Sequence, residues 1–237
     1  TDASLREVQE NRTLSASRSL FALSLVPSSQ YIGKGEAVSI KLTAKQGDGK
    51  VAANVSGTCT VHPLKRNNEG KEDDEMLTIS TKSPLLQSDI TTDDEGKATI
   101  VFPADALDTR GILRFTVTLT SPDGETSEAH LDLPSRNGRK GSHPAPDQLN
   151  LLAHDKQSAT GTKARFLIET PAPTGYVWLF PHAGWTKESY SMVTTRGHVG
   201  ESSINLRPED MPNTAVEAFT VYQGKLQQTK VHILVPP

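Results

Sequence analysis

The sequence predicts an all-β protein that consists of two tandem antiparallel β-sandwich domains. Apolar and polar residues alternate with a period of two over short segments, a pattern typical of strands that bury one face. The 17 glycines and 15 prolines are spread along the chain and separate these segments with turn signals. The length of 237 residues suffices for one or two domains, since a domain usually takes ~150 residues.

Two segments that open in the same way favour two related domains over one large domain. A short apolar strand that starts at Leu23 leads through a glycine turn into the alternating residues 37–42. A second apolar strand that starts at Leu149 leads through another glycine turn into residues 164–168. The two openings lie 126 residues apart (149 minus 23), which leaves room for a complete small sandwich between them.

The boundary between the domains is predicted from composition. Residues 134–146 contain no apolar side chain larger than alanine or proline and are rich in chain breakers. Such a segment cannot offset its ordering entropy by burial, so we expect a solvated linker. The predicted organisation is a tail from a preceding module at 1–22, a domain at 23–134, a flexible linker at 135–148 and a domain at 149–237.

In the first domain, glycine-containing turns at 47–49, 93–96 and 122–124 separate the strands. The last of these turns contains Asp123 and Gly124, which tolerate positive φ, and it lies between two alternating segments, so it predicts a tight hairpin. After the opening strand at 23–27, strands are predicted near 38–44, 55–61, 76–79, 98–102, 113–119 and 127–133.

The second domain has seven short alternating segments in about ninety residues, as antiparallel sandwiches do. Gln223-Gly224-Lys225 is predicted to close the final hairpin. Strands are predicted near 149–153, 164–169, 176–180, 190–194, 202–206, 216–222 and 230–235.

Most aromatic residues of the second domain fall between positions 176 and 190. Alternation places Tyr176, Trp178 and Phe180 on one face of a strand. In a small sandwich that face is normally the core, so we expect Trp178 to be a core residue. Trp185 stands beside Gly184 at a turn and is the candidate for an exposed contact.

Composition and motifs exclude several functions. The net charge of −3 excludes a broadly basic surface for nucleic acid, and no segment approaches the ~18 to 20 apolar residues of a membrane-spanning helix. We find no zinc-protease motif, nucleophile elbow, phosphate loop or dinucleotide fingerprint, and the seven histidines are scattered. The acidic residues 72–75 and 93–95 lack the alternating spacing of a calcium loop. We therefore expect no enzymatic activity, no metal and no cofactor.

Cys59 is the only cysteine, which excludes a disulfide within the chain and a cysteine-cluster zinc site. It stands in the alternating segment 56–61, so we expect a small, inert core residue. The polar segment 64–75 is longer than a hairpin requires, and we expect a tolerated surface insertion that is open to proteolysis.

The order of several motifs matches a known pattern. In the second domain, Asp155-Lys156 precedes a turn at Gly161, an apolar strand closes on Thr170-Pro171, and Pro212-Asn213 precedes a long alternating strand. The companion pattern of the first domain consists of Tyr31, Gly35-Glu36, Gly49-Lys50-Val51, Thr92-Asp93, Gly96, Ala98 and Phe102. This order resembles the macroglobulin-like domains, with a fibronectin-like or immunoglobulin-like fold, of the bacterial alpha-2-macroglobulin family over residues 20–237. The sequence departs from the pattern at Lys34, Ala159 and Thr160.

The resemblance implies a large protein of the periplasm or cell envelope that acts as a broad-spectrum protease trap. In such proteins a protease cuts an exposed bait segment, the domains rearrange, and the protease is restrained. Many members also carry a thioester formed within a Cys-x-Glu-Gln motif. Here Cys59 is followed by Thr60-Val61-His62, so this chain has no thioester residues.

The chain is thus interpreted as a scaffold fragment whose partners are proteases, bound through the full-length protein, and neighbouring macroglobulin-like domains. If the bait lies within it, trypsin-like proteases are expected to cut at two basic stretches. The candidate positions are Lys65, Arg66, Arg136, Arg139 and Lys140.

Two alternatives remain open. The strands that follow Thr92-Asp93 also resemble the immunoglobulin-like modules of bacterial adhesins and surface stalks. The aromatic stretch from Trp178 to Trp185 is the only feature that favours a glycan-binding module.

Overall fold

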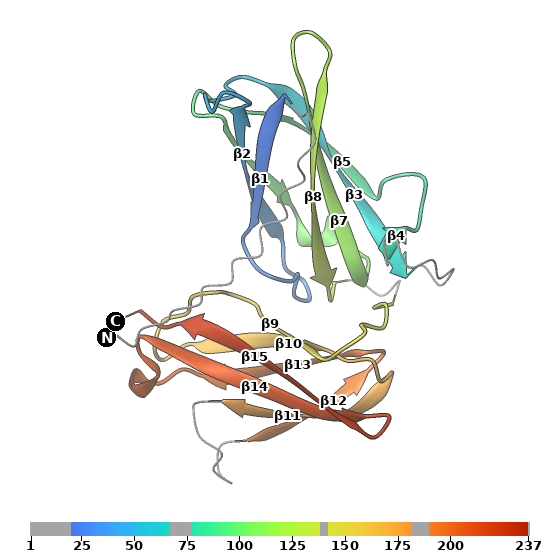
Figure 1. Cartoon of the computed structure of the whole chain (residues 1–237), viewed down its shortest axis with the longest axis vertical. Coiled ribbons are helices and arrows are strands. Elements are labelled where there is room, and N and C mark those ends of the chain that lie inside the picture. The colour runs from blue at the N-terminus through green and yellow to red at the C-terminus, as the bar shows by residue number, and fades with distance from the viewer. Residues whose placement is uncertain (1–19, 67–76, 138–141, 182–189, 237) are drawn as a thin grey trace.

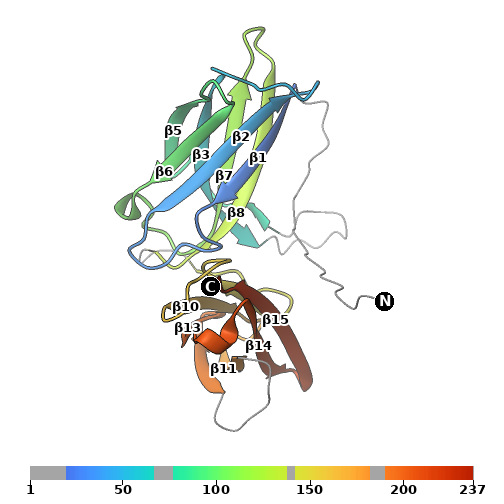
Figure 2. The same ribbon diagram turned by 90° about the vertical axis from the view of Figure 1, so that its left-hand side faces the viewer.

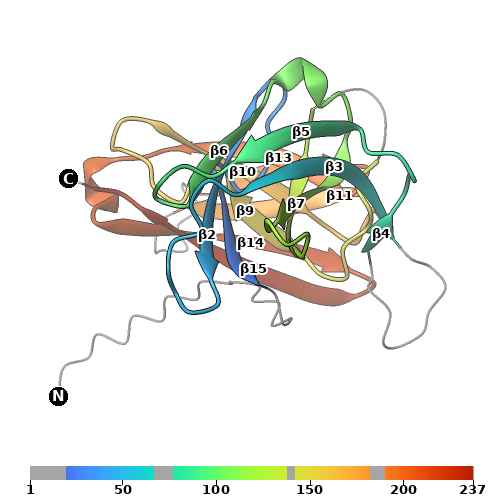
Figure 3. The same cartoon turned by 90° about the horizontal axis from the view of Figure 1, so that it is seen from above.

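The computed structural model describes residues 20–66, 77–137, 142–181 and 190–236, and almost all of its regular structure is antiparallel β-sheet. Strands β1 to β8 form one unit, called the first sandwich, and strands β9 to β15 form another, called the second sandwich (Figure 1). The first sandwich stands on one face of the second in both side views (Figures 1 and 2). The view from above shows its strands lying over β9, β10 and β13 (Figure 3). The all-β prediction is confirmed.

The first sandwich contains two sheets. One has the order β1-β2-β6, and the other has the order β4-β3-β7-β8, with β5 also paired to β3. A short 3-10 helix, η1 (Ala104–Ala106), connects the sheets. The strands are β1 (Phe21–Pro27), β2 (Val38–Gln46), β3 (Ser56–Arg66), β4 (Leu77–Ile79), β5 (Leu86–Thr91), β6 (Lys97–Phe102), β7 (Gly111–Thr120) and β8 (Thr126–Ser135).

Alternating apolar side chains fill the core of the first sandwich. Every second residue of β7 is buried, with Leu113, Phe115, Val117 and Leu119 facing the β1-β2-β6 sheet from the centre of the β4-β3-β7-β8 sheet. Cys59 of β3 lies opposite Val117 in this core and is fully buried, as expected for an inert core residue. Burial raises the pKa of the Cys59 thiol to about 12, because the charged thiolate would lose its hydration.

The second sandwich is a single rolled sheet of seven strands in the order β15-β14-β11-β12-β13-β10-β9. The sheet turns at the β12–β13 hairpin, so that β9, β10 and β13 form one layer and the other four strands form the second (Figure 1). A short 3-10 helix, η2 (Pro208–Asp210), precedes β14. The strands are β9 (Asn150–Ala153), β10 (Lys163–Glu169), β11 (Thr174–Pro181), β12 (Ser191–Arg196), β13 (Val199–Asn205), β14 (Asn213–Tyr222) and β15 (Lys225–Leu234).

The predicted final hairpin is confirmed. Tyr222 pairs with Lys225, and the two residues between them, Gln223 and Gly224, have φ of 49° and 74°. Positive φ at both central residues is the geometry whose twist suits a two-residue hairpin. Glycine adopts it without strain, whereas the glutamine carries a steric cost from its Cβ.

Two expectations for the first sandwich differ from the structure, one at its start and one in its middle. Strand β1 begins at Phe21, which is a buried core residue, although residues up to 22 were expected to belong to a tail. Strand β5 was not predicted, because only Ile90 among its six residues is buried and the alternation is weak. Residues 1–19 lie outside the described residues.

The expectation of a solvated linker is wrong for the described ends of that segment. Ser135 closes strand β8, and Ser135, Asn137 and His143 are all buried. Side-chain hydrogen bonds compensate for the lack of large apolar groups: the Asn137 side-chain amide donates to the carbonyl of Ala104, and His143 Nε2 donates to the carbonyl of Ser135 at 2.9 Å.

The expected orientation of strand β11 is also wrong. Val177 and Leu179 are fully buried in the core, and Tyr176, Trp178 and Phe180 face outward. Both faces of this segment are apolar, so alternation alone does not decide which is inside. The core face packs with the small Val216 and Ala218 of β14, which leaves room for aliphatic side chains rather than for three rings.

Candidate functional site: the junction between the two sandwiches

Three residues of the outer face of the β9-β10-β13 layer form an apolar seat for the first sandwich. In β10, Phe166 and Ile168 point into the core, so Leu167 points outward, and there it packs with Val199 and the half-buried Leu152. Tyr31, in the loop between β1 and β2, inserts into this seat and is itself buried. The junction therefore contains a small hydrophobic core of its own.

The backbone fixes the loop that carries Tyr31 on both sides. The amide of Gln30 donates to the carbonyl of His154 in the second sandwich, at 2.9 Å. Ile32 exchanges hydrogen bonds with the end of β8, through the carbonyl of Pro134 and the amide of Arg136, both at 2.8 Å. The Tyr31 ring meets the His154 imidazole edge to face, with centroids 4.9 Å apart. Burial raises the pKa of Tyr31 above its ordinary value, so its hydroxyl stays neutral.

Beside Tyr31 lies a group of four charged or titratable side chains, called the Glu36 cluster: Glu36, His154, Asp155 and Arg165. Glu36 comes from the first sandwich, and the other three come from the second. One Glu36 oxygen, Oε2, lies 2.8 Å from His154 Nε2, and the other accepts a hydrogen bond from Arg165 Nη1. His154 Nδ1 lies 3.0 Å from Asp155 Oδ2. The amide of Gly33 donates to Glu36 Oε2 at 3.2 Å and holds the carboxylate in place.

The electrostatics of the Glu36 cluster favour the charged carboxylate. Partial burial alone would raise the pKa of Glu36, but the hydrogen bond from Arg165 and the nearby His154 together lower it below its ordinary value of 4.5. The hydrogen bond to Glu36 raises the pKa of Arg165, against the opposite effect of burial. The two sandwiches are thus joined by an ion pair as well as by apolar packing.

Two further contacts cross from the first sandwich. Arg136 Nε lies 3.4 Å from Glu201 Oε1 of β13. Arg66, at the end of β3, donates to the carbonyl of Ala145 and forms an ion pair with Asp147 in the segment that leads into β9. That segment is therefore anchored to the first sandwich before the second one begins.

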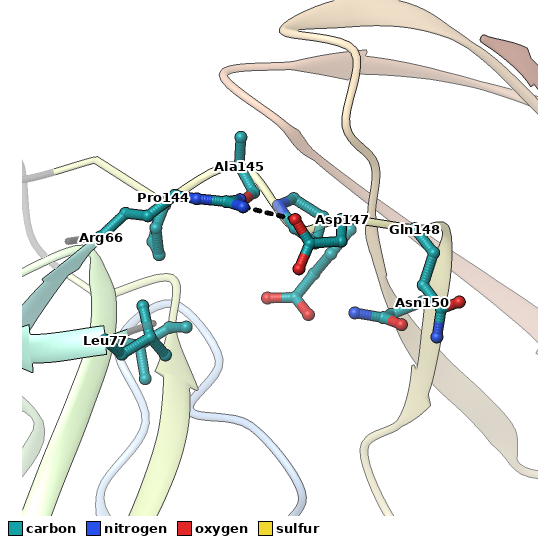
Figure 4. A pocket seen from close by; sticks show the side chains of 10 residues that line it. Arg66, Leu77, Pro144, Ala145, Asp147, Gln148 and Asn150 are labelled. Atoms are coloured by element: carbon teal, nitrogen blue, oxygen red, sulfur yellow. Dashed lines mark hydrogen bonds and ion pairs between the residues drawn. The ribbon is translucent and has the colours of Figure 1, made fainter. Parts of the chain in front are cut away.

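A cavity of about 500 Å³ lies where this segment passes between the sandwiches (Figure 4). Arg66, Leu77 and Ile112 line it from the first sandwich, and Asn150 and Glu169 line it from the second. Residues 144–148 form the remaining wall. The cavity exists only because the two sandwiches are placed together.

The residues predicted to be protease-sensitive have different environments. Lys65 is exposed, whereas Arg66 is partly buried and engaged with Ala145 and Asp147. Arg136 is partly buried and pairs with Glu201. The structure thus brings Arg66 and Arg136 to the same junction. Arg139, Lys140 and Trp185 lie outside the described residues.

Sequence reasoning did not identify the junction. Glu36 and Asp155 each appeared in the motif order, but nothing local indicated that residues more than a hundred positions apart would meet. Among the described residues, no group of three or more histidine, cysteine, aspartate or glutamate side chains is arranged to hold a metal ion. No helix in the described part of the chain is long and apolar enough to cross a membrane.

A second surface feature lies on the far side of the second sandwich, away from the junction (Figure 1). Trp178 pairs with Met192 of β12 and Phe219 of β14, and the rings of Phe180 and Phe219 are in edge contact with centroids 5.4 Å apart. Tyr176, Tyr190 and Met192 are each more than half exposed. This outer aromatic face is formed by alternate residues of β11, β12 and β14.

Comparison with known proteins gives similarity at the level of fold. No protein-family model and no curated protein matches the sequence. Among solved structures, the chain is similar to trypsin-activated alpha-2-macroglobulin from Escherichia coli, with 11% identity and a TM-score of 0.35 over 92% of this chain and 17% of that chain. The native conformation of the E. coli protein gives 12% identity and a TM-score of 0.38 over 94% of this chain and 16% of that chain. A 1.5-MDa bacterial ice-binding adhesin gives 10% identity and a TM-score of 0.29 over 93% of this chain and 66% of that chain.

The chain therefore spans 16 to 17% of the length of these two alpha-2-macroglobulin structures. Similarity at this level concerns β-sandwich architecture and does not discriminate between an inhibitor and an adhesin.

Proposed function

We propose that this chain is a non-catalytic scaffold of two macroglobulin-like domains within a bacterial alpha-2-macroglobulin-like protease trap of the cell envelope. In this role its partners are proteases, bound through the whole protein, and the neighbouring domains. The order of motifs in both halves of the sequence supports the proposal, and so does the two-sandwich architecture in which those motifs lie.

The observation that carries the proposal is the packed junction. Tyr31 fills an apolar seat formed by Leu167 and Val199, and the Glu36 cluster adds an ion pair across the same contact. Because both elements are partly or fully buried, they resist independent motion of the two sandwiches better than a solvated linker would. A trap whose domains rearrange after one cut requires units that transmit displacement in this way.

The covalent step of thioester-containing traps is not assigned to this chain. Cys59 is buried in the first sandwich and its raised pKa disfavours the thiolate, so it suits a structural role. The proposed contribution is mechanical.

The proposal is tested on the parent protein that contains this chain. Treatment with trypsin should change its shape, measured by small-angle X-ray scattering, and should leave the protease active on a small peptide but inhibited on a large protein substrate. The matched control is trypsin with a blocked active site, which should cause neither change. If the parent protein neither changes shape nor restrains any of several unrelated proteases, the proposal is wrong.

The outer aromatic face favours one other function, glycan binding, because Tyr176 and Tyr190 are more than half exposed beside Trp178. Aromatic rings offer flat apolar surfaces on which sugar rings can stack. Replacing Tyr176 and Trp178 with alanine should then abolish binding on a glycan array. If the unmodified chain binds no glycan, this second function is excluded.

The adhesin alternative is separated from the trap by the same trypsin experiment. A surface stalk should be cut without a coupled change of shape, and it should not restrain the protease.

A further inference from the structure

The cavity at the junction has the dimensions and lining of a ligand site. Its volume of about 500 Å³ falls in the range of known small-molecule pockets, ~300 to 1,000 Å³. Leu77 and Pro144 provide apolar walls (Figure 4), and Ile112 and Pro146 also line the cavity. Two charged groups in it already neutralise each other, since Arg66 forms an ion pair with Asp147. Among the described lining residues, the remaining charge is Glu169.

Glu169, the last residue of β10, is a largely buried carboxylate, with a side chain that is 12% exposed. His143 lies beside it, with Nδ1 3.7 Å from Glu169 Oε1. This distance is too long for a hydrogen bond. No described residue donates a hydrogen bond to Glu169, and a carboxylate that loses hydration without such a donor is costly.

The hydrogen bond of His143 is made by Nε2 and not by Nδ1, the nitrogen that faces Glu169. Its Nε2 lies 2.9 Å from the carbonyl oxygen of Ser135, and a carbonyl only accepts, so Nε2 carries a proton. When Nε2 carries the only proton, the imidazole presents a lone pair at Nδ1. This Nδ1 has no hydrogen-bond partner among the described residues, and the His143 side chain is only 2% exposed. In that form two acceptors, Nδ1 and the Glu169 carboxylate, face each other, and no described residue places a donor between them.

We propose that this cavity binds a ligand with an alkylammonium or alkylguanidinium group, which donates to Glu169 while its aliphatic stem packs against Leu77, Ile112 and the prolines. The cation supplies the donor that Glu169 lacks, and Arg66 does not repel it strongly because Asp147 neutralises Arg66. The volume suits one lysine- or arginine-sized side chain. This inference is independent of the protease-trap proposal and stands or falls by its own test.

The test is a titration of the isotope-labelled chain with Nα-acetyl-arginine amide, followed by the NMR signals of Asn150 and of the Glu169 carboxylate. Nα-acetyl-citrulline amide is the control ligand, because it has nearly the same shape but a neutral urea group in place of the guanidinium group. Putrescine tests an alkylammonium group. We expect saturable shifts with the arginine compound and affinity at least ~10-fold weaker for the citrulline compound, because a charge-assisted hydrogen bond is lost. If only putrescine saturates the shifts, the cavity still binds an organic cation at Glu169, and the ligand is then a free alkylamine rather than an arginine side chain.

Two variants complete the experiment. Glu169→Gln should weaken binding by ~10-fold or more. Glu217→Gln, which removes a carboxylate paired with Lys230 outside the cavity, should leave binding unchanged. The inference is overturned if citrulline and arginine compounds bind equally, if Glu169→Gln has no effect, or if no cation saturates the site up to ~20 mM. It is also overturned if the nitrogen signals show His143 protonated on both ring nitrogens at pH 7, because Glu169 would then have its cation already.

Discussion

A double-mutant cycle between Glu36 and Arg165 measures the ion pair that joins the two sandwiches. Glu36→Gln preserves the shape of the side chain but removes its charge, and Arg165→Met preserves most of the aliphatic stem. The Glu36 carboxylate makes hydrogen bonds with Arg165 and lies 2.8 Å from His154 Nε2, so the single substitution Glu36→Gln loses more than the pair alone. Because the Arg165 side chain is 42% exposed, water screens its attraction to Glu36.

We therefore expect a coupling energy of about 1 kcal/mol between Glu36 and Arg165, at the upper end of values for exposed pairs. Glu36→Gln alone should cost about 1 to 2 kcal/mol, because the mostly buried His154 also loses a charged partner. The assay is urea unfolding at pH 7 of the unmodified chain, the two single variants and the double variant. Tryptophan fluorescence and circular dichroism monitor the unfolding. The contacts between the sandwiches disappear when either one unfolds, so the coupling affects the transition of the less stable sandwich.

Glu217→Gln is the matched control, since it removes a carboxylate paired with Lys230 within the second sandwich alone. Its effect should stay within about 0.5 kcal/mol and should not depend on Arg165. A coupling energy below about 0.3 kcal/mol between Glu36 and Arg165 would refute the argument that this pair stabilises the junction.

Four other outcomes follow from the same contacts. Replacing Tyr31 with alanine should destabilise the chain by about 2 to 4 kcal/mol in urea unfolding, because it empties the apolar seat, and an effect below about 1 kcal/mol would contradict this. The pKa of Glu36 is lower in the folded chain than its ordinary value of 4.5. Its contribution to the free energy of unfolding is therefore fully present above pH 4.5 and should be lost as the pH falls through the pKa of the folded state. Urea midpoints measured from pH 7 to pH 3 should therefore fall less for Glu36→Gln than for the unmodified chain. Cys59 should not react with a disulfide reagent at pH 8 until denaturant is added, whereas rapid labelling of the folded chain would contradict its burial and raised pKa. Gln223→Asn should raise stability by about 0.5 kcal/mol, because asparagine tolerates the positive φ of this turn, and an unchanged urea midpoint would argue against that geometry.

Much of the fold was predictable because alternation of side chains reports directly on strand burial. In β7 the buried residues Leu113, Phe115 and Val117 stand at every second position, and the strand was predicted near its observed bounds. In β5 the signal is weak, since Ile90 is its only buried residue and Leu86 is only partly buried. The strand forms because its backbone pairs with β3, and backbone pairing leaves little trace in composition.

The orientation of β11 could not be predicted for a different reason. Val177 and Leu179 on one face and Tyr176, Trp178 and Phe180 on the other are all apolar, so the pattern has no polar face. The choice depends on the volume between the two layers, which is set by residues of other strands such as Val216 and Ala218.

The junction could not be predicted from sequence because its parts are distant along the chain. Glu36 and Arg165 are separated by 129 positions, and although Glu36 stands in the motif order, nothing local to either residue indicates its partner. Even the burial of His143 was hidden, because its local segment is rich in residues that usually remain in solvent. Only the placement of one sandwich on the other assigns these residues a role.

The most direct test of the docked scaffold is a distance distribution between the two sandwiches. Spin labels at Asp123→Cys, in the turn between β7 and β8, and at Lys225→Cys, the first residue of β15, would lie at exposed hairpin ends of the first and second sandwich. Double electron-electron resonance at pH 7 should give one narrow distribution of the distance between the two labels. This distribution should broaden when Tyr31→Ala and Glu36→Gln are introduced together. A broad distribution in the otherwise unmodified chain would contradict the account, because the sandwiches would then move independently despite the contacts at Tyr31 and Glu36.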